Sequence, residues 1–149
     1  MAAVEKARAI AESRLEAAKA LPTAYLRRVF PQPDEFLTEG WKWLKLGEVC
    51  SDISDGTHFT PNYLPKGIPF LSVKDIRETG ILFDNCKYIS EDQRKELCKR
   101  CKPEKRDVLY TKIGITGIAK AIDTAAEFSI FVSVALLKLG ANIKPGHLW

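Results

Sequence analysis

The sequence has few of the residues from which catalytic and metal sites are commonly built. Only two histidines and four cysteines occur among its 149 residues. No Ser–His–Asp set, no paired catalytic carboxylates in a recognisable frame, no dinucleotide-binding fingerprint and no P-loop are visible. These absences favour a binding module over an enzyme, and we predict no catalytic residue and no cofactor.

Long apolar runs are also lacking. The longest, residues 128–139, contains two serines and a lysine. It is too short for a membrane helix, which needs ~20 residues. The first residues lead into an alanine-rich amphipathic stretch and carry no signal peptide. We therefore expect a soluble, cytoplasmic protein that does not insert into a membrane.

The cysteines do not form a recognisable metal motif. Cys98 and Cys101 have the CxxC spacing, but Cys50 and Cys86 stand alone. A structural zinc site usually needs two such pairs, or one pair with two histidines. We predict two free thiols one turn apart in a helix and no metal site; a zinc or redox role is the alternative.

Positive charge is concentrated in one segment. The chain as a whole has a net charge of +4, and residues 94–106 hold seven basic residues against two acidic ones. A local field of this sign attracts polyanions. A solvated helix face followed by a polar loop explains the same pattern, and composition does not separate the two interpretations.

The N-terminal segment has the periodicity of an amphipathic helix. Small apolar residues recur at steps of three or four, which places them on one face. Pro22 predicts a break near Leu21, with a second short helix from Pro22 to Phe30. We expect a helical arm over residues 1–30 and a Pro/Gly-punctuated linker over 31–40. The predicted partner-binding face comprises Val4, Ala7, Ala11, Leu15 and Ala18.

The remaining chain alternates strand and helix signals. We predict a strand within 41–46, a loop over 52–61 and a strand from about Phe70. A helix capped by Ser90 is predicted over 90–102, with further strands at 108–113, 118–122 and 129–139. This mixture predicts an α/β (mixed α+β) domain over residues 41–149.

Two polar loops carry the candidate binding residues. In the first, Thr57, His58 and Thr60 could hydrogen-bond a phosphate or a base edge. The second, 114–117, contains two glycines that let backbone N–H groups approach an anion, and Lys112 and Lys120 flank it. A well-formed surface loop and a simple hairpin turn are the alternatives.

Several sequence blocks resemble the DNA-specificity subunit of type I restriction–modification systems. They are WLKLGEV (43–49), DISDGTHFTP (52–61), GIPFLSVKDI (67–76) and DVLYTKIG (107–114), followed by Thr116 and Gly117. The resemblance covers residues 41–149 well, and the arm is similar to a helix adjoining a target-recognition domain in that family.

This resemblance implies a non-catalytic specificity component in host defence. Such a subunit carries two target-recognition domains, each of which reads one half of a split site on double-stranded DNA, so this chain is expected to read one half. The family's subunit docks methyltransferase (modification) subunits, which bind S-adenosylmethionine, and a separate restriction subunit cuts DNA. The predicted DNA-binding residues are Thr57, His58, Thr60, Lys74, Lys112, Thr116, Gly117 and Lys120.

The chain also departs from the family pattern. It holds one recognition domain where the family has two, and it is expected to be truncated within that domain. Ile118 stands where the family often has lysine. The alternative function is a helical protein-interaction module, which could self-associate through the arm, or a fragment without autonomous DNA binding.

Overall fold

The structure is a computed structural model that describes residues 2–30 and 42–140. The chain divides into two units, Met1–Trp43 and Leu44–Trp149. The predicted linker at 31–40 and the last nine residues lie outside the described residues. No helix in the described ranges is long and apolar enough to cross a membrane.

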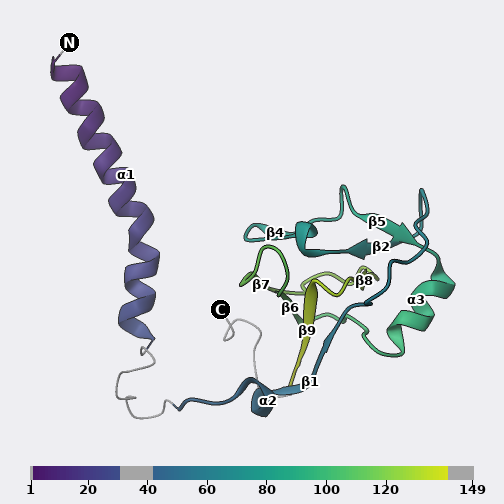
Figure 1. Ribbon diagram of the computed structural model, residues 1–149. Coiled ribbons are helices and arrows are strands. Elements are labelled where there is room, and N and C mark those ends of the chain that lie inside the picture. The colour runs from purple at the N-terminus through teal and green to yellow at the C-terminus, as the bar shows by residue number, and fades with distance from the viewer. Residues whose placement is uncertain (1, 31–41, 141–149) are drawn as a thin grey trace. The chain divides into compact units, whose positions relative to one another are not determined.

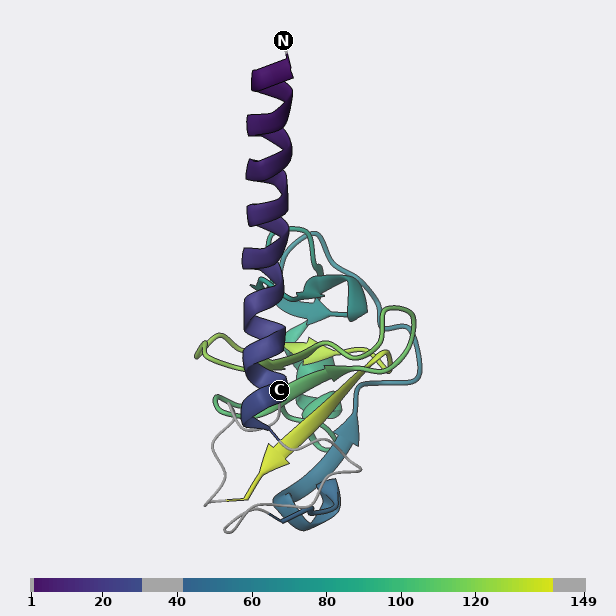
Figure 2. The ribbon, with the colours of Figure 1, turned by 90° about the vertical axis from the view of Figure 1, so that its left-hand side faces the viewer.

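The first unit contains one long helix, α1 (Ala2–Val29). The predicted break near Pro22 is wrong, since α1 runs through this residue without interruption (Figures 1 and 2). Proline removes only one backbone hydrogen bond from a helix, and the alanine, leucine and arginine residues around it have high helix propensity. Ion pairs along the helix surface, such as Arg8 with Glu12 at 2.9 Å, add a little support.

The second unit begins with a short helix and a four-stranded antiparallel sheet. The strand predicted within 41–46 is wrong for the residues described there: residues 42–45 have no regular secondary structure, and the helix α2 (Leu46–Val49) follows them. Its N-terminal backbone is held by Glu48, whose carboxylate accepts from the Lys45 N–H at 2.6 Å. The sheet has the order β1-β9-β6-β7, with β9 between β1 and β6 (Figure 2). Its strands are β1 (Cys50–Asp55), β6 (Val108–Thr111), β7 (Ala119–Ala121) and β9 (Val134–Leu139).

A second, three-stranded sheet is mixed in direction. The strand β2 (Ile68–Leu71) pairs antiparallel with β5 (Lys87–Ile89) and parallel with β8 (Ser129–Ile130). The 3-10 helix η1 (Val73–Asp75) follows β2 and leads into a small hairpin, β3 (Ile76–Arg77) and β4 (Gly80–Ile81). A long helix followed by mixed strands and helix confirms the predicted fold class.

The helix α3 (Glu91–Cys98) confirms the predicted N-cap. The Ser90 hydroxyl accepts from the Gln93 N–H at 3.1 Å. The helix ends four residues before the predicted boundary at 102. Cys101 therefore lies beyond α3, where it is buried in the core.

Two strand boundaries differ from the prediction. Residues 52–55, predicted as loop, belong to β1 and pair with β9. Residues 129–139, predicted as one strand, form β8 and β9, separated by a turn at 131–133. The reason lies in the pairing, because β8 joins the three-stranded sheet and β9 the four-stranded one.

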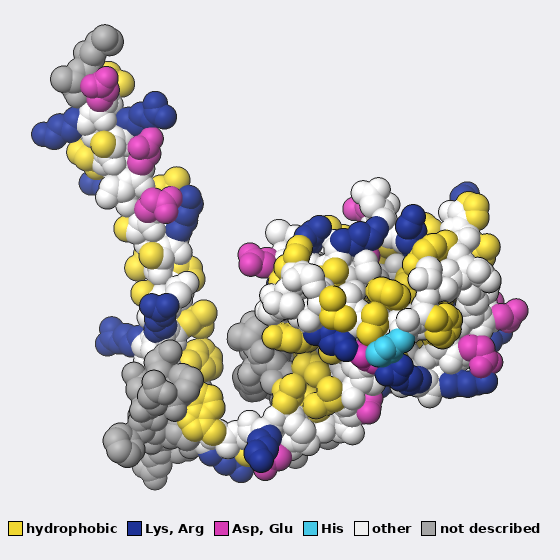
Figure 3. Space-filling view, viewed as in Figure 1, with side chains coloured by type: hydrophobic (Ala, Val, Ile, Leu, Met, Phe, Trp, Pro, Cys, Tyr) yellow, Lys and Arg dark blue, Asp and Glu magenta, His cyan; other side chains and the backbone are white. Residues whose placement is uncertain are grey.

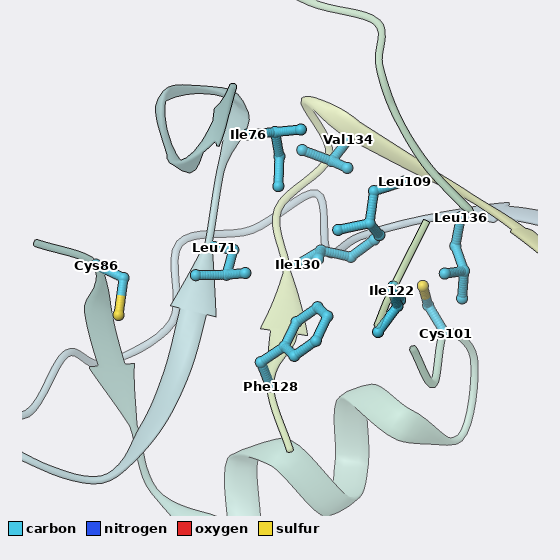
Figure 4. Close-up of a cluster of buried hydrophobic side chains, with 10 residues drawn as sticks. All are labelled: Leu71, Ile76, Cys86, Cys101, Leu109, Ile122, Phe128, Ile130, Val134 and Leu136. Carbon is cyan, nitrogen blue, oxygen red and sulfur yellow. The ribbon is translucent and has the colours of Figure 1, made fainter. Parts of the chain in front are cut away.

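Both sheets contribute to one hydrophobic core. Figure 4 shows side chains from β2, β6, β8 and β9 converging with Phe128 and Ile122. Apolar burial of this kind supplies the main driving force for folding. The core holds the strand ends, and the loops that follow them, in set positions. Its members are Leu71, Ile76, Cys86, Cys101, Leu109, Ile122, Phe128, Ile130, Val134 and Leu136.

Candidate nucleic-acid interface

The turn between β8 and β9 holds the first predicted loop. The Thr57 N–H donates to the Ile130 carbonyl at 3.1 Å, and the Val132 N–H donates back to the Thr57 carbonyl at 3.0 Å. Gly56 donates to the Val134 carbonyl at 3.3 Å. The backbone of residues 56–57 is therefore bound to this turn on both sides.

The same turn holds two further segments through Ser133. The Ser133 hydroxyl accepts from the Val73 N–H at 3.1 Å, which anchors the start of η1. The Ser133 carbonyl accepts from the Lys112 N–H at 3.0 Å, which anchors the root of the 112–117 loop. Segments far apart in sequence are thus gathered around residues 131–133.

A cluster of charged side chains, which we call the Asp55 cluster, lies at the end of β1. Both carboxylate oxygens of Asp55 lie 3.1 Å from His58 Nε2. The same carboxylate accepts from the Arg100 guanidinium and from the Lys112 ammonium. Three basic side chains from three parts of the chain therefore converge on one acidic group.

The cluster lowers the pKa of Asp55. Burial acts to raise this pKa, but the hydrogen bonds and charges of Lys112 and His58 outweigh it, and the net shift is downward. An anion stabilised in this way remains ionised well into the acidic range. Asp55 is thus a permanent negative charge beneath its basic partners at neutral pH.

The second predicted loop is closed by glycine conformations and by Thr111. Gly114 and Gly117 have φ angles of +84° and +92°, which favour glycine. The Thr111 carbonyl accepts from the Gly117 N–H at 3.0 Å, and its hydroxyl accepts from the Ile118 N–H at 2.9 Å. Thr116 lies exposed at this loop.

On one face of the second unit, Lys and Arg side chains gather with a histidine and an acidic group among hydrophobic side chains (Figure 3). Two exposed isoleucines, Ile113 and Ile115, come from the 112–117 loop, and exposed Phe59 comes from the other loop. The arrangement combines positive charge, hydrogen-bonding groups and apolar side chains, which are the groups that contact phosphates and bases.

Solved structures with the same architecture have been found. The crystal structure of the HsdS subunit from Thermoanaerobacter tengcongensis is 25% identical over 97% of this chain, with a TM-score of 0.66. A structure described by the complex assembly and conformational transition of the type I R-M system contains a chain that is 26% identical over 97% of this chain, with a TM-score of 0.69. The chain resembles the specificity subunit of type I restriction–modification systems. The resemblance predicted from the sequence blocks is thereby confirmed.

The chain spans 36% of the length of each of these two specificity-subunit chains. No protein-family model matches the sequence, and no curated protein matches it either.

The predicted DNA-binding residues of the second unit differ in their exposure and in their contacts. His58 and Lys112 share Asp55, and His58 and Thr60 are exposed. Thr57 is only 7% exposed, and its hydroxyl lies 3.3 Å from both the N–H and the carbonyl of Phe59. The Thr57 side chain therefore shapes the loop from within.

Lys74 and Lys120 lie outside the Asp55 cluster. Lys74 belongs to η1, and its ammonium donates to the Asn85 carbonyl at 3.4 Å. Lys120 belongs to β7 and lines a hollow with Thr79, Gly80 and Asp123. Both contribute positive charge to the second unit without joining the central group.

Three residues of the site escaped the sequence prediction: Asp55, Arg100 and Ser133. Arg100 is 45 positions from Asp55, and Ser133 is 60 positions from Val73. The basic run at 94–106 was the one available signal for Arg100. Three of the seven basic residues in that run are paired locally: Lys95 with Glu91, Lys99 with Glu96, and Lys102 with Glu104. The solvated-face interpretation fits these lysines, whereas Arg100 faces the loop.

Ion pairs also fasten the end of this basic run to β9. Lys138 donates to Glu104 and to Asp107, both at 2.9 Å. Hydrogen bonds from Lys102 and Lys138 lower the pKa of Glu104 to about 2. This second cluster links β9 to the turn that precedes β6 and stabilises that turn.

The CxxC pair is divided between surface and core. Cys98 ends α3 and is partly buried, whereas Cys101 is 6% exposed. Burial raises the pKa of the Cys101 thiol. Within residues 2–30 and 42–140, no group of three or more His, Cys, Asp or Glu side chains is arranged to hold a metal ion.

Proposed function

We propose that this chain supplies DNA sequence recognition to a type I restriction–modification complex and performs no catalysis itself. In this proposal residues 41–149 form the target-recognition domain, and residues 1–30 form a helical arm that docks methyltransferase subunits. The restriction subunit joins indirectly through that assembly. The complex would act on double-stranded DNA in the cytoplasm as part of host defence.

The observation that carries the proposal is the gathering of both predicted loops around residues 131–133 in a fold that resembles a specificity subunit. The exposed side chains available for DNA are those of His58, Thr60 and Thr116. Gly117 supports the second loop, since its N–H donates to the Thr111 carbonyl. The phosphate partners are Lys74, Lys112 and Lys120. Loops on a rigid core suit recognition because they vary in sequence without disturbing the fold.

Salt dependence of binding tests the proposal. The full chain is titrated against a fluorescent duplex of mixed sequence at several salt concentrations. Contacts from four or five cations predict a slope of about −4 in log K against log salt. Lys74→Ala and Lys112→Ala should each reduce the magnitude of the slope by about 1. Lys95→Ala is the control, because Lys95 is an exposed lysine of α3 that pairs with Asp92. Weak binding that does not depend on salt would exclude the proposal.

A second candidate function, protein interaction through the arm, is favoured by the exposed apolar side chains of α1. Val4 is 72% exposed and Leu15 is 55% exposed. With Ala7, Ala11 and Ala18 they form the predicted partner-binding face. Small residues on such a face allow close helix–helix approach.

Matched substitutions separate the two functions. Ala11→Glu places a charge on the proposed face, whereas Ala9→Glu places it about 200° around the helix. Light scattering, alone and with a type I methyltransferase subunit, measures assembly. If only Ala11→Glu abolishes assembly while DNA binding persists, the arm mediates assembly and the domain binds DNA, as proposed. Equal effects of the two variants would exclude the proposed face.

A further inference from the structure

We infer that Arg100, His58 and Lys112 form a binding site for one DNA backbone phosphate, which we call the phosphate seat. Asp55 positions these three side chains. This inference rests on the proposed function and goes beyond it, because it adds Arg100 and assigns Asp55 a role. The ligand is a phosphodiester group, an anion with a single negative charge.

The exposed fractions of the four side chains show which of them lie nearer to solvent. The side chain of Asp55 is 15% exposed, whereas those of Arg100 and His58 are both 59% exposed and that of Lys112 is 35% exposed. The carboxylate therefore lies beneath and the basic groups lie toward solvent. An approaching phosphate meets the basic side chains before it meets Asp55.

The basic groups keep hydrogen-bond donors to spare. An ammonium has three donors and a guanidinium has five, and the Asp55 carboxylate uses only part of each set. His58 contacts Asp55 through Nε2, which leaves Nδ1 on the other side of the ring. Several charge-assisted hydrogen bonds can thus be made to one phosphate without breaking those to Asp55.

The charge of the cluster suits a single phosphodiester. Lys112 and Arg100 carry two positive charges and Asp55 one negative charge, so the cluster is cationic even with a neutral His58. Without Asp55, two or three cations would repel one another and spread apart. The carboxylate holds them at one point, which reduces the entropy lost when a phosphate binds.

The backbone beneath the seat is already fixed. The backbone of Lys112 is hydrogen-bonded to Ser133, and the 56–57 segment is hydrogen-bonded to Ile130 and Val134. The Arg100 N–H donates to the Leu97 carbonyl at 3.2 Å. A cavity of about 380 Å³ adjoins the cluster, lined by Thr57, Phe59, Leu97 and Arg100 among others. This hollow leaves room beside the seat for the sugar attached to the phosphate.

The first test compares Arg100 with a neighbouring lysine. Lys99 is 70% exposed, adjoins Arg100 in sequence and is paired with Glu96 rather than with Asp55. Binding of the full chain to a mixed-sequence duplex is measured against salt for Arg100→Ala, Lys112→Ala and Lys99→Ala. We expect roughly tenfold weaker binding for the first two, as for the loss of a hydrogen bond to a charged group. Each should also reduce the magnitude of the slope by about 1, while Lys99→Ala stays close to the parent.

A double-mutant cycle tests the positioning role of Asp55. If Asp55 acts through Arg100, then Arg100→Ala should weaken binding far less in an Asp55→Ala background than in the parent chain. Asp55→Asn keeps the shape of the side chain and repeats the cycle should the alanine variant unfold. Thermal unfolding of each variant shows that the binding data refer to folded protein.

The outcomes separate this inference from the proposed function. If the parent chain fails to bind DNA at every salt concentration, both are overturned. If the parent binds but Arg100→Ala behaves like Lys99→Ala, the phosphate seat is overturned and the proposed function stands. Additive effects of Asp55→Ala and Arg100→Ala would leave Arg100 in the seat and remove Asp55 as its positioning residue.

Discussion

The backbone of Gly56 touches the backbone at Ile130. A Cβ atom built on Gly56 would lie 2.1 Å from the Ile130 carbonyl oxygen, far inside van der Waals contact. The neighbouring Thr57 N–H donates to the same oxygen. Glycine at position 56 is therefore what allows the first loop to lie against the β8–β9 turn.

Gly56→Ala should destabilise the second unit by about 2 kcal/mol or more, because backbone atoms cannot move aside as a flexible side chain can. Urea unfolding measures the loss. Gly47→Ala is the control: it lies in α2 with no atom within 4 Å of the added Cβ. There alanine should be neutral or stabilise by about 0.5 kcal/mol. Equal stability of the two variants would contradict the close approach.

Replacing each of two buried serines near the 131–133 turn by alanine should affect the stability of the protein differently. Ser133→Ala removes the acceptor of the Val73 N–H and should cost about 1–3 kcal/mol, the penalty for an unsatisfied buried donor. The Ser129 hydroxyl is buried and makes no hydrogen bond within the described part of the chain. Ser129→Ala should therefore be neutral or stabilising. Chemical unfolding of both variants gives the comparison, and a larger loss for Ser129→Ala would overturn this account.

Replacing Pro22 should strengthen α1. Proline in a helix interior costs up to ~3 kcal/mol relative to alanine, and α1 tolerates it. Pro22→Ala should raise the helical circular dichroism signal and shift its thermal loss to higher temperature. Thr23→Ala, the adjacent control, should gain only a few tenths of a kcal/mol, about the difference in helix propensity. A Pro22→Ala signal no larger than that of the control would point to a break at this position.

Acid should weaken the cluster of Glu104, Asp107 and Lys138. The pKa of Glu104 is lowered to about 2 from its ordinary value of 4.5. A lowered pKa means that the stabilisation is complete above pH 4.5 and is lost as the pH falls toward 2. Glu104→Gln should thus destabilise the protein at pH 7 and have little effect near pH 2. The size should be modest because Glu104 is half exposed and solvent screens its ion pairs. A difference in unfolding free energy that is the same at both pH values would contradict the assigned ion pairs.

Local features of the fold were predictable where neighbouring residues decide them. The Ser90 cap depends on residues three positions apart, and the glycine-rich turn at 114–117 depends on residues that accept positive φ. The strands β6 and β7 begin and end within a few residues of their predicted bounds, and β2 begins close to its predicted start. Two failures, at 52–55 and 129–139, occurred where distant strand pairing overrides local preference.

The sequence alone determined the helical arm, the mixed α+β class and the motif blocks that resemble a specificity subunit, because periodicity, capping and motif spacing are properties of contiguous residues. Only the tertiary structure decided that Asp55 meets Arg100 and Lys112, which lie 45 and 57 positions away. It also decided that Ser133 joins η1 to the 112–117 loop. These contacts follow from how the strands pair and pack around the core. Strand pairing brings together residues that are far apart in the sequence, and their positions in the sequence do not reveal that they are close in space.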